Sequence, residues 1–226
     1  MKILSGDLLL IRFLLTESCT STLCTQLSSA TGNDPGCSSA TKACIYGIQY
    51  GDQSFSVGYF SRERLTVTTT GVINNFLFGC GQNNQGLFGG SAGLIGLGRH
   101  PISFVQQTAS KYNKIFSYCL PSTSSSTGHL NIGGCAYRKL LYTSFTTISR
   151  GSSFYDLDIV SIIVSGVKLS LTPSLFSSGV AIIDSGTVIT RLPPLPMPLS
   201  SPPSGRACPS TPLPLSSPYS TRVTST

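Results

Sequence analysis

The 226-residue sequence predicts a mostly β protein built from short antiparallel strands. From about residue 44 to 192, short apolar or β-branched runs alternate with Gly, Asn, Asp and Ser, which favour turns. Glycine is abundant, with 23 residues, and only 10% of residues are charged. No strand–helix–strand alternation occurs, so a parallel sheet with crossover helices is not expected.

The first predicted elements are consecutive strands. CIYGIQY (44–50) and FSVGYFSRERLTV (55–67) flank the turn GDQS and predict a hairpin. NNFLFGC (74–80) predicts the next strand, and AGLIGLG (92–98) is an apolar run interrupted by glycines.

A helix is expected from residue 103 to about 111, with Ser103 as a possible cap. A Ser-rich loop follows at 122–127. Further strands are expected near four stretches: 129–133, 140–146, 154–164 and 180–184.

Eight cysteines are many for this length, and they indicate an oxidising compartment. Half of them lie in a Ser-, Thr- and Gly-rich stretch of 26 residues, which we expect to be a disulfide-bonded loop region: Cys19, Cys24, Cys37 and Cys44. No Cys-x-x-Cys pair or Cys/His cluster has zinc spacing, so no metal is expected. His100 and His129 stand alone in the sequence and are expected at the surface.

Both ends of the chain differ from the middle. Asp7 and Arg12 interrupt the leucine-rich start, leaving no clean signal peptide, and no apolar run approaches the ~18 residues of a membrane span. Ten of the fourteen prolines lie in 193–226, where we expect an extended or disordered tail.

The formal charge of +7 comes from 15 basic and 8 acidic residues. The densest basic pairs are Arg62/Arg64 and Arg138/Lys139, with no basic stripe and no interleaved aromatic residues. This pattern argues against nucleic-acid binding.

The run VAIIDSGTVIT (180–190) places Asp184 after an apolar strand and before Ser-Gly-Thr. A strand can deliver a carboxylate to a tight turn there, and hydroxyls beside it can orient the charge. Asp-Ser-Gly alone, however, is more often an ordinary turn at the end of a strand.

The surrounding residues extend this motif into a family resemblance. AIIDSGTVITRLPP resembles the second active-site motif of pepsin-like aspartic proteases, in particular their plant nepenthesin-like branch. The likeness continues, in order, through CIYGIQYGDQSFSVGYF, FLFGCGQNNQGLFGGSAGLIGLGR, SFVQQTASKYNKIFSYCLPS and SFYDLDIVSIIVSGVKL, and covers about 18–194. It implies the pepsin-like acid-protease fold, with most of an N-terminal lobe and a truncated C-terminal lobe.

The resemblance also implies a division of the chain into four parts. They are an atypical N-terminus (1–17), a partial N-terminal lobe with the flap and the Cys-rich region (18–135), the start of a C-terminal lobe with the DSGT motif (136–194), and a Pro/Ser-rich tail (195–226).

Carried over residue by residue, the resemblance makes Asp184 one of two catalytic carboxylates. Ser185 would join the hydrogen-bonded grip between the active-site loops, Gly186 would allow close backbone approach, and Thr187 would hydrogen-bond the carboxylate. Tyr50 in QYGDQS would be the tyrosine of the flap that closes over the substrate.

Gly51 and Asp52 would then form the tip of that flap, and Leu94-Ile95-Gly96 would thread behind the first catalytic loop. In this family two carboxylates share one proton and activate a water against a peptide bond, without metal or cofactor. The implied partner is a protein or peptide substrate, and the implied state is a monomer.

The first Asp-Thr-Gly motif of the family is not found. The acids before Tyr50 are Asp7, Glu17 and Asp34, and none is followed by Ser/Thr-Gly. We therefore expect a chain that is incomplete at both ends and inactive by itself.

The resemblance further implies a nested disulfide pairing, Cys19–Cys44 and Cys24–Cys37, in a secreted, extracellular or apoplastic protein. The partners of Cys80 and Cys119 would lie outside this sequence, while Cys135 and Cys208 have no counterpart in the family.

Two alternatives remain open. A non-catalytic relative, such as the plant xylanase inhibitors that share this fold and bind glycosidases, would need no first motif. A homodimer that supplies one aspartate per chain would restore the carboxylate pair.

Overall fold

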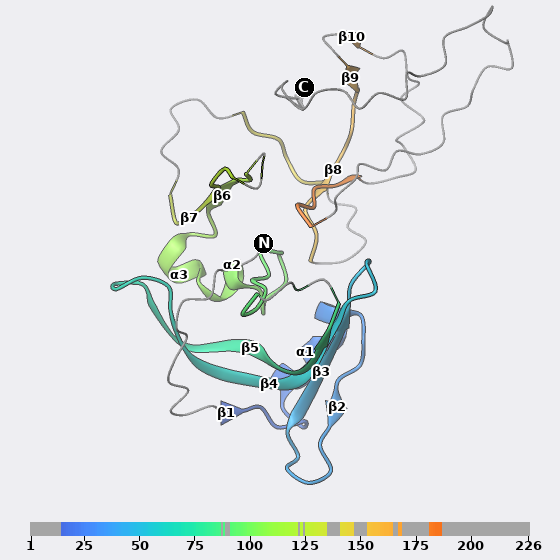
Figure 1. Ribbon diagram of the computed structural model, residues 1–226, viewed down its shortest axis with the longest axis vertical. Coiled ribbons are helices and arrows are strands. Elements are labelled where there is room, and N and C mark those ends of the chain that lie inside the picture. Colours follow the sequence, from blue (N-terminus) through green and yellow to red (C-terminus); the bar gives the residue numbers. More distant parts are fainter. Residues whose placement is uncertain are drawn as a thin grey trace, which may run out of the picture. The chain divides into compact units, whose positions relative to one another are not determined.

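The computed structural model describes residues 15–86, 88, 91–121, 123, 125–134, 141–146, 153–164, 167–168 and 181–186. The chain divides into two compact units (Figure 1). The first comprises residues 1–140 and 150–155, and the second comprises residues 141–149 and 156–226. The strands in both units pair antiparallel, which confirms the predicted mostly β class.

A five-stranded sheet forms the centre of the first unit. Hydrogen bonds link its strands in the order β1-β4-β3-β2. The fifth strand, β5, pairs with the edge of β4 opposite to β1 and β3. The hairpin and the strand after it are therefore confirmed, and Figure 1 shows β4 and β5 as two long, curved strands that lie side by side. The strand bounds are β1 Leu15–Thr16, β2 Gly36–Cys37, β3 Cys44–Gln49, β4 Phe55–Thr66 and β5 Val72–Gln85.

The curvature of β4 and β5 coincides with two register shifts, between Val57 and Gly58 and between Glu63 and Leu65. Such bulges bend and twist a ladder locally. At the first shift, a Cβ added to Gly58 would collide with the carbonyl oxygen of Cys80. Glycine is thus needed where the two backbones approach most closely.

Helix α1, Thr22–Thr31, occupies the Cys-rich stretch that the sequence analysis expected to be a loop, so that expectation was wrong. The Ser21 side chain accepts from the Cys24 amide and caps the helix start. Gly32, with φ of 75°, ends the helix in the left-handed conformation. Ser21 and Gly32, one on each side of these ten residues, were the signal in the sequence that could have predicted the helix.

The core of the first unit lies between α1 and the sheet. Cys24 and Leu27, three residues apart, share one helix face, and both are buried. They pack into a cluster with Cys44, Tyr46 and Phe60 from the strands.

The disulfide pairing is crossed, Cys19–Cys37 and Cys24–Cys44, and the nested pairing was wrong. The helix is the physical reason, because it turns Cys24 into the core, with its Cα 5.9 Å from that of the fully buried Cys44. Cys37, opposite Cys44 in the ladder, is exposed and bonds to Cys19, with 5.3 Å between their Cα atoms.

The buried carboxylate of Glu17 forms an ion pair with Arg62 of β4. The backbone of Glu17 bridges two segments, since its amide donates to Phe60 and its carbonyl accepts from Cys44. Glu17 therefore fixes the chain just after β1 against both central strands.

The predicted helix over 103–111 is present but divided into α2, Phe104–Gln107, and α3, Ala109–Tyr112. Ser103 caps α2 as expected, because its side chain accepts from the Gln106 amide. The break falls at Thr108, whose hydroxyl donates back to the carbonyl of Phe104.

His100, just before these helices, is buried with 7% of its surface exposed, so the predicted surface position was wrong. Its ring contacts Ser29 on α1, a contact between residues 71 positions apart. Sequence spacing gave no indication of it. His129, in contrast, is exposed as predicted.

Strands β6, Phe116–Cys119, and β7, His129–Ile132, form a separate pair in the first unit. β7 confirms the strand expected near 129–133. Cys119 and Cys80 are free thiols, whereas Cys135 lies outside the described residues, as does Cys208.

The second unit holds only short ladders in its described part. β8 Asp156–Leu157 pairs with β11 Ala181–Ile182, and β9 Ile163–Val164 pairs with β10 Val167–Lys168. The strand expected over 154–164 is thus two short strands, and the one near 180–184 narrows to two residues.

The strand expected over 140–146 was wrong, because the described residues 141–146 contain no ladder. Leu141 and Tyr142 are each 79% exposed, so this apolar run gains little from burial that would hold a strand. The predicted domain boundaries, the N-terminus through residue 14 and the Pro/Ser-rich tail stay predictions.

Candidate functional site

The turn between β3 and β4, residues 50–54, forms the hairpin tip. The Tyr50 amide donates to the Ser54 carbonyl at 2.8 Å, and the Gln53 amide donates to the Tyr50 carbonyl at 3.0 Å. Gln53 adopts a positive φ of 70°, which lets the chain reverse within these five residues. The tip is therefore a defined turn that brings Tyr50, Gly51 and Asp52 together.

Asp52 holds the tip with its side chain. Its Oδ1 accepts from the Ser54 amide at 2.9 Å and from the Ser54 hydroxyl at 2.5 Å. These hydrogen bonds stabilise the carboxylate and lower the pKa of Asp52, and the bond from the Ser54 hydroxyl has the larger effect. The geometry gives Asp52 a turn-forming role.

Tyr50 lies half-buried at the first position of the tip. Its ring meets Phe88 edge-on, with 6.0 Å between ring centroids and 78° between planes. Burial raises the pKa of Tyr50, with smaller contributions from Tyr46 and Asp52. The phenol therefore stays protonated, and can donate a hydrogen bond, at acidic and neutral pH.

A hydrogen-bonded chain ties the three strands together below the tip. The Ser56 hydroxyl donates to Asn84 Oδ1 at 2.6 Å, which leaves its oxygen to accept from Tyr46 at 2.7 Å. Burial raises the pKa of Tyr46, which suits its donor role. Sequence reasoning missed this chain, because its members lie on three strands up to 38 residues apart (46 to 84).

Asp184 lies in a turn, residues 184–186, two residues beyond the end of β11. Its Oδ1 accepts from the Gly186 amide at 2.8 Å, an Asx-type turn of the kind Asp commonly makes. Asp184, Ser185 and Gly186 are all exposed. The strand and the turn thus present the carboxylate as the motif predicts, while Thr187 lies outside the described residues.

Leu94, Ile95 and Gly96 lie near α2. The Gly96 carbonyl accepts from the Phe104 amide at the start of that helix, at 3.0 Å. Leu94 is 45% exposed, so it is not a core position of the described first unit.

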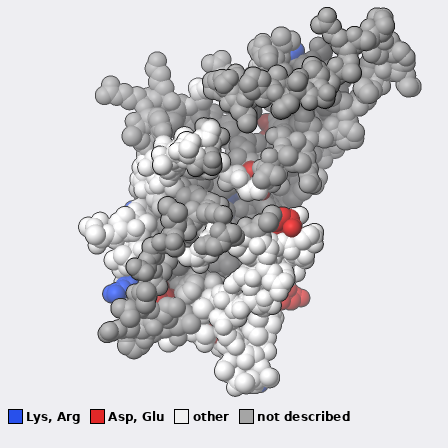
Figure 2. Space-filling view, in the orientation of Figure 1, with Lys and Arg blue, Asp and Glu red and all other residues white. Residues whose placement is uncertain are grey.

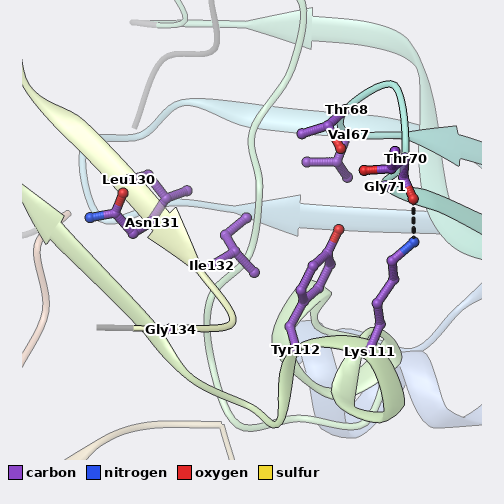
Figure 3. Close-up of a pocket in the computed structure, with 10 residues that line it drawn as sticks. All are labelled: Val67, Thr68, Thr70, Gly71, Lys111, Tyr112, Leu130, Asn131, Ile132 and Gly134. Carbon is purple, nitrogen blue, oxygen red and sulfur yellow. Dashed lines mark hydrogen bonds between the residues drawn. The ribbon is translucent and has the colours of Figure 1, made fainter. Parts of the chain in front are cut away.

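A pocket of about 630 Å³ lies at the other end of β4 from the hairpin tip, beside the β4–β5 turn (Figure 3). Figure 3 shows Lys111 and Tyr112 pointing from α3 toward that turn. Lys111 already donates to the Thr70 carbonyl at 2.7 Å. The lining residues are Val67, Thr68, Thr70, Gly71, Lys111, Tyr112, Leu130, Asn131, Ile132 and Gly134.

Charge and metal chemistry add no further site in the described part of the chain. There, no group of three or more His, Cys, Asp or Glu residues could hold a metal ion. On the face shown in Figure 2, the charged side chains that are drawn in colour stand apart, without a basic patch. No described helix has the length and hydropathy to cross a membrane.

Comparison with known families decides the relationship. The family described as "Xylanase inhibitor N-terminal" matches residues 15–134, more than half of the chain. This is the N-terminal domain of pepsin-like plant aspartic proteases, and it contains the hairpin tip. The chain belongs to the pepsin-like aspartic protease family. The predicted fold and family are both confirmed.

Curated relatives are also named as aspartic proteases. An aspartyl protease family protein of Arabidopsis thaliana is 58% identical over 178 residues, which are 78% of this chain and 37% of that protein. The aspartyl protease AED1 of the same plant is 48% identical over 179 residues, with 78% and 36% covered. Aspartic proteinase nepenthesin-1 of Nepenthes gracilis is 38% identical over 186 residues, with 77% and 40% covered.

The chain thus spans little more than a third of the length of these relatives. No solved structure matches it significantly. The two disulfides and the plant relatives are consistent with a secretory or extracellular location.

Proposed function

We propose that this chain carries one half of the catalytic machinery of an aspartic endopeptidase. Asp184 is the catalytic carboxylate of that half, and the hairpin tip is the flap that covers a bound peptide. The observation that carries the proposal is the Asp-Ser-Gly-Thr motif that follows β11, in which the exposed Asp184 carboxylate accepts from the Gly186 amide. The names of the relatives support the reaction class.

The roles follow from the chemistry of paired carboxylates. The Asp184 carboxylate and a second carboxylate from another polypeptide segment would share one proton, and one water would bind between the two. The ionised member would take a proton from the water as it attacks the peptide carbonyl, and the protonated member would donate to the carbonyl oxygen. Ser185 and Thr187 would support the loop by hydrogen bonding.

Tyr50 would act from the flap side. Its protonated phenol can donate a hydrogen bond toward a substrate or its neighbours, and Gly51 leaves the tip without a side chain that would obstruct a peptide. Closure of such a tip would exclude water from the site. Asp52 would keep the tip in shape through Ser54.

The 226-residue chain alone contains no second Asp-Ser/Thr-Gly sequence. We therefore expect the purified chain to show no acid-dependent, pepstatin-sensitive cleavage of a denatured protein substrate. Such cleavage, retained after repurification, would overturn this part of the proposal.

A chimera tests the role of Asp184 directly. Residues 18–194 would replace the matching segment of the 58%-identical Arabidopsis protein, which supplies the rest of the chain. We expect acid proteolysis that Asp184→Asn reduces by at least about 10³-fold and that the exposed Asp158→Asn leaves unchanged. Equal activity in the two variants would remove Asp184 from the catalytic role.

A non-catalytic, glycosidase-binding function is the alternative, and the name of the matching family favours considering it. Capture of a glycoside hydrolase by the purified chain, with inhibition of that hydrolase and an inactive chimera, would favour this alternative. An active chimera that depends on Asp184 would favour the protease.

A further inference from the structure

His100 connects two segments of the first unit that are distant in sequence. Its Nε2 lies 3.0 Å from the hydroxyl of Ser29, near the C-terminal end of α1. Its Nδ1 accepts from the amide of Ile102, in the turn before α2, at 3.3 Å. The ring itself is buried, whereas Ser29 is exposed, so both contacts are partly shielded from water.

The partners on the two sides determine where the ring carries its proton. A backbone amide can only donate, so Nδ1 must present its lone pair to Ile102. The Ser29 hydroxyl donates to the Gln26 carbonyl at 2.9 Å, so its oxygen accepts from Nε2. Both constraints select the same neutral tautomer, with the proton on Nε2.

A second proton has only Nδ1 to occupy, and there it would face the Ile102 N–H. Two donors would then oppose each other in a buried place, which costs free energy. Burial also lowers the pKa of His100 below its ordinary value of 6.5.

The packed elements offer little charge to stabilise an imidazolium. Neither α1 nor α2 contains an ionisable side chain apart from the disulfide-bonded Cys24. Two charged residues lie close by, one next to His100 in the chain and one in the loop after α1. The Arg99 guanidinium donates to the Phe154 carbonyl, and the Asp34 carboxylate accepts from Ser28.

We propose that His100 is an acid-sensitive latch, which joins α1 to the turn before α2 when neutral and releases Ile102 when the ring takes up a second proton. The Ile102 carbonyl also accepts from Gln107, whose side chain pairs with the backbone of Leu77 on β5. Release of Ile102 would therefore loosen the support of one β5 position, while Cys24–Cys44 keeps the other end of α1 in place.

The sign of the pH effect follows from the depressed pKa. The unfolded chain binds the second proton more readily than the folded chain. The latch therefore makes its full contribution to the unfolding free energy above about pH 6.5. Its contribution falls as the pH decreases from there toward the folded-state pKa.

The primary test is a histidine titration of the full chain by NMR. We expect long-range ¹H–¹⁵N correlations that show the Nε2–H tautomer for His100, and a His100 midpoint below the ordinary histidine value of 6.5. An Nδ1–H tautomer, or a His100 midpoint at or above 6.5, would overturn the proposal.

Hydrogen exchange at the Ile102 amide tests the release itself. We expect its protection factor to fall as the pH decreases from about 6.5 toward the His100 midpoint, by up to about tenfold per pH unit, and to level off below that midpoint. His100→Asn offers an amide oxygen to the same N–H and does not titrate, so its protection should stay flat. His129→Asn should behave as the wild type. Constant protection in the wild type, or an equal fall in His100→Asn, would refute the latch.

Discussion

Two aspartate turns in this chain share one local geometry but have different surroundings. At the hairpin tip, Asp52 Oδ1 accepts from the amide two residues ahead, at 2.9 Å. In the turn of residues 184–186, Asp184 Oδ1 accepts from the amide two residues ahead, at 2.8 Å. Both carboxylates are exposed.

The supports of the two turns differ in length and kind. The hairpin tip joins the six-residue β3 to the twelve-residue β4, in a sheet held by disulfides and a partly buried ion pair. The turn of Asp184 follows the two-residue strand β11, paired with the equally short β8.

The two turns together teach that the Asx-type turn does not by itself mark a catalytic aspartate. Asp52 uses its second hydrogen bond, from the Ser54 hydroxyl, to close its own turn. The proposed catalytic role of Asp184 rests instead on the family motif that surrounds it. Four measurements test whether the two turns differ as described.

The largest expected effect comes from removing the disulfide that supports the hairpin. Loss of Cys24–Cys44 by a double alanine variant should lower the unfolding free energy by about 3 kcal/mol, since it closes a loop of about 20 residues and fills the core. Urea unfolding monitored at the hairpin amides measures it.

The matched control is a double alanine variant at Cys19 and Cys37, where Cys37 is exposed. It should lower the unfolding free energy less than the loss of Cys24–Cys44, because it removes no fully buried side chain from the core. A greater loss from this outer pair would contradict the packing argument.

The second effect concerns the ion pair. Glu17→Gln should lower the unfolding free energy by about 1–2 kcal/mol, less than a fully buried pair, because the Arg62 side chain is 37% exposed. Arg64→Gln, at an exposed position on the same strand, is the control and should change it little. Equal denaturation midpoints for Glu17→Gln and the wild type would show that the pair does not support β4.

The third effect is a pH dependence at the hairpin tip. Because the pKa of Asp52 is lowered, its hydrogen bonds are fully present above about pH 3.8 and are lost as the pH falls through the folded-state pKa. The Ser54 amide shift should follow this titration in the wild type. It should stay constant in Asp52→Asn, and a shift that persists there would assign the titration to another group.

The smallest effect is expected at the second turn. Asp184→Asn should change the unfolding free energy by less than about 0.5 kcal/mol, since the residue is exposed and Asn can form the same turn. Thermal unfolding of the full chain measures it. A loss above about 1 kcal/mol would give Asp184 a structural role like that of Asp52.

Much of the fold followed from local sequence patterns. The hairpin, the cap at Ser103 and the strand at β7 all formed where alternation and turn residues placed them. Each of these depends on interactions between near neighbours in the chain, which a linear pattern can express. The turn at Asp184 also formed as its motif indicated.

Two of the errors have a different cause. The crossed disulfides and the burial of His100 depend on which surfaces pack together. A helix in the Cys-rich stretch turns Cys24 inward and brings Ser29 over the histidine. Neither outcome can be read from spacing alone.

The fold class and the family therefore followed from the linear sequence, which also offers Asp184 as the proposed catalytic aspartate. The order of motifs and the residues that form turns depend on near neighbours in the chain, so both are visible in the sequence. The disulfide partners, the partner of Glu17 and the buried position of His100 emerge only in the folded chain. Those depend on contacts between residues up to 71 positions apart, which form only when α1 packs against its sheet and the turn before α2.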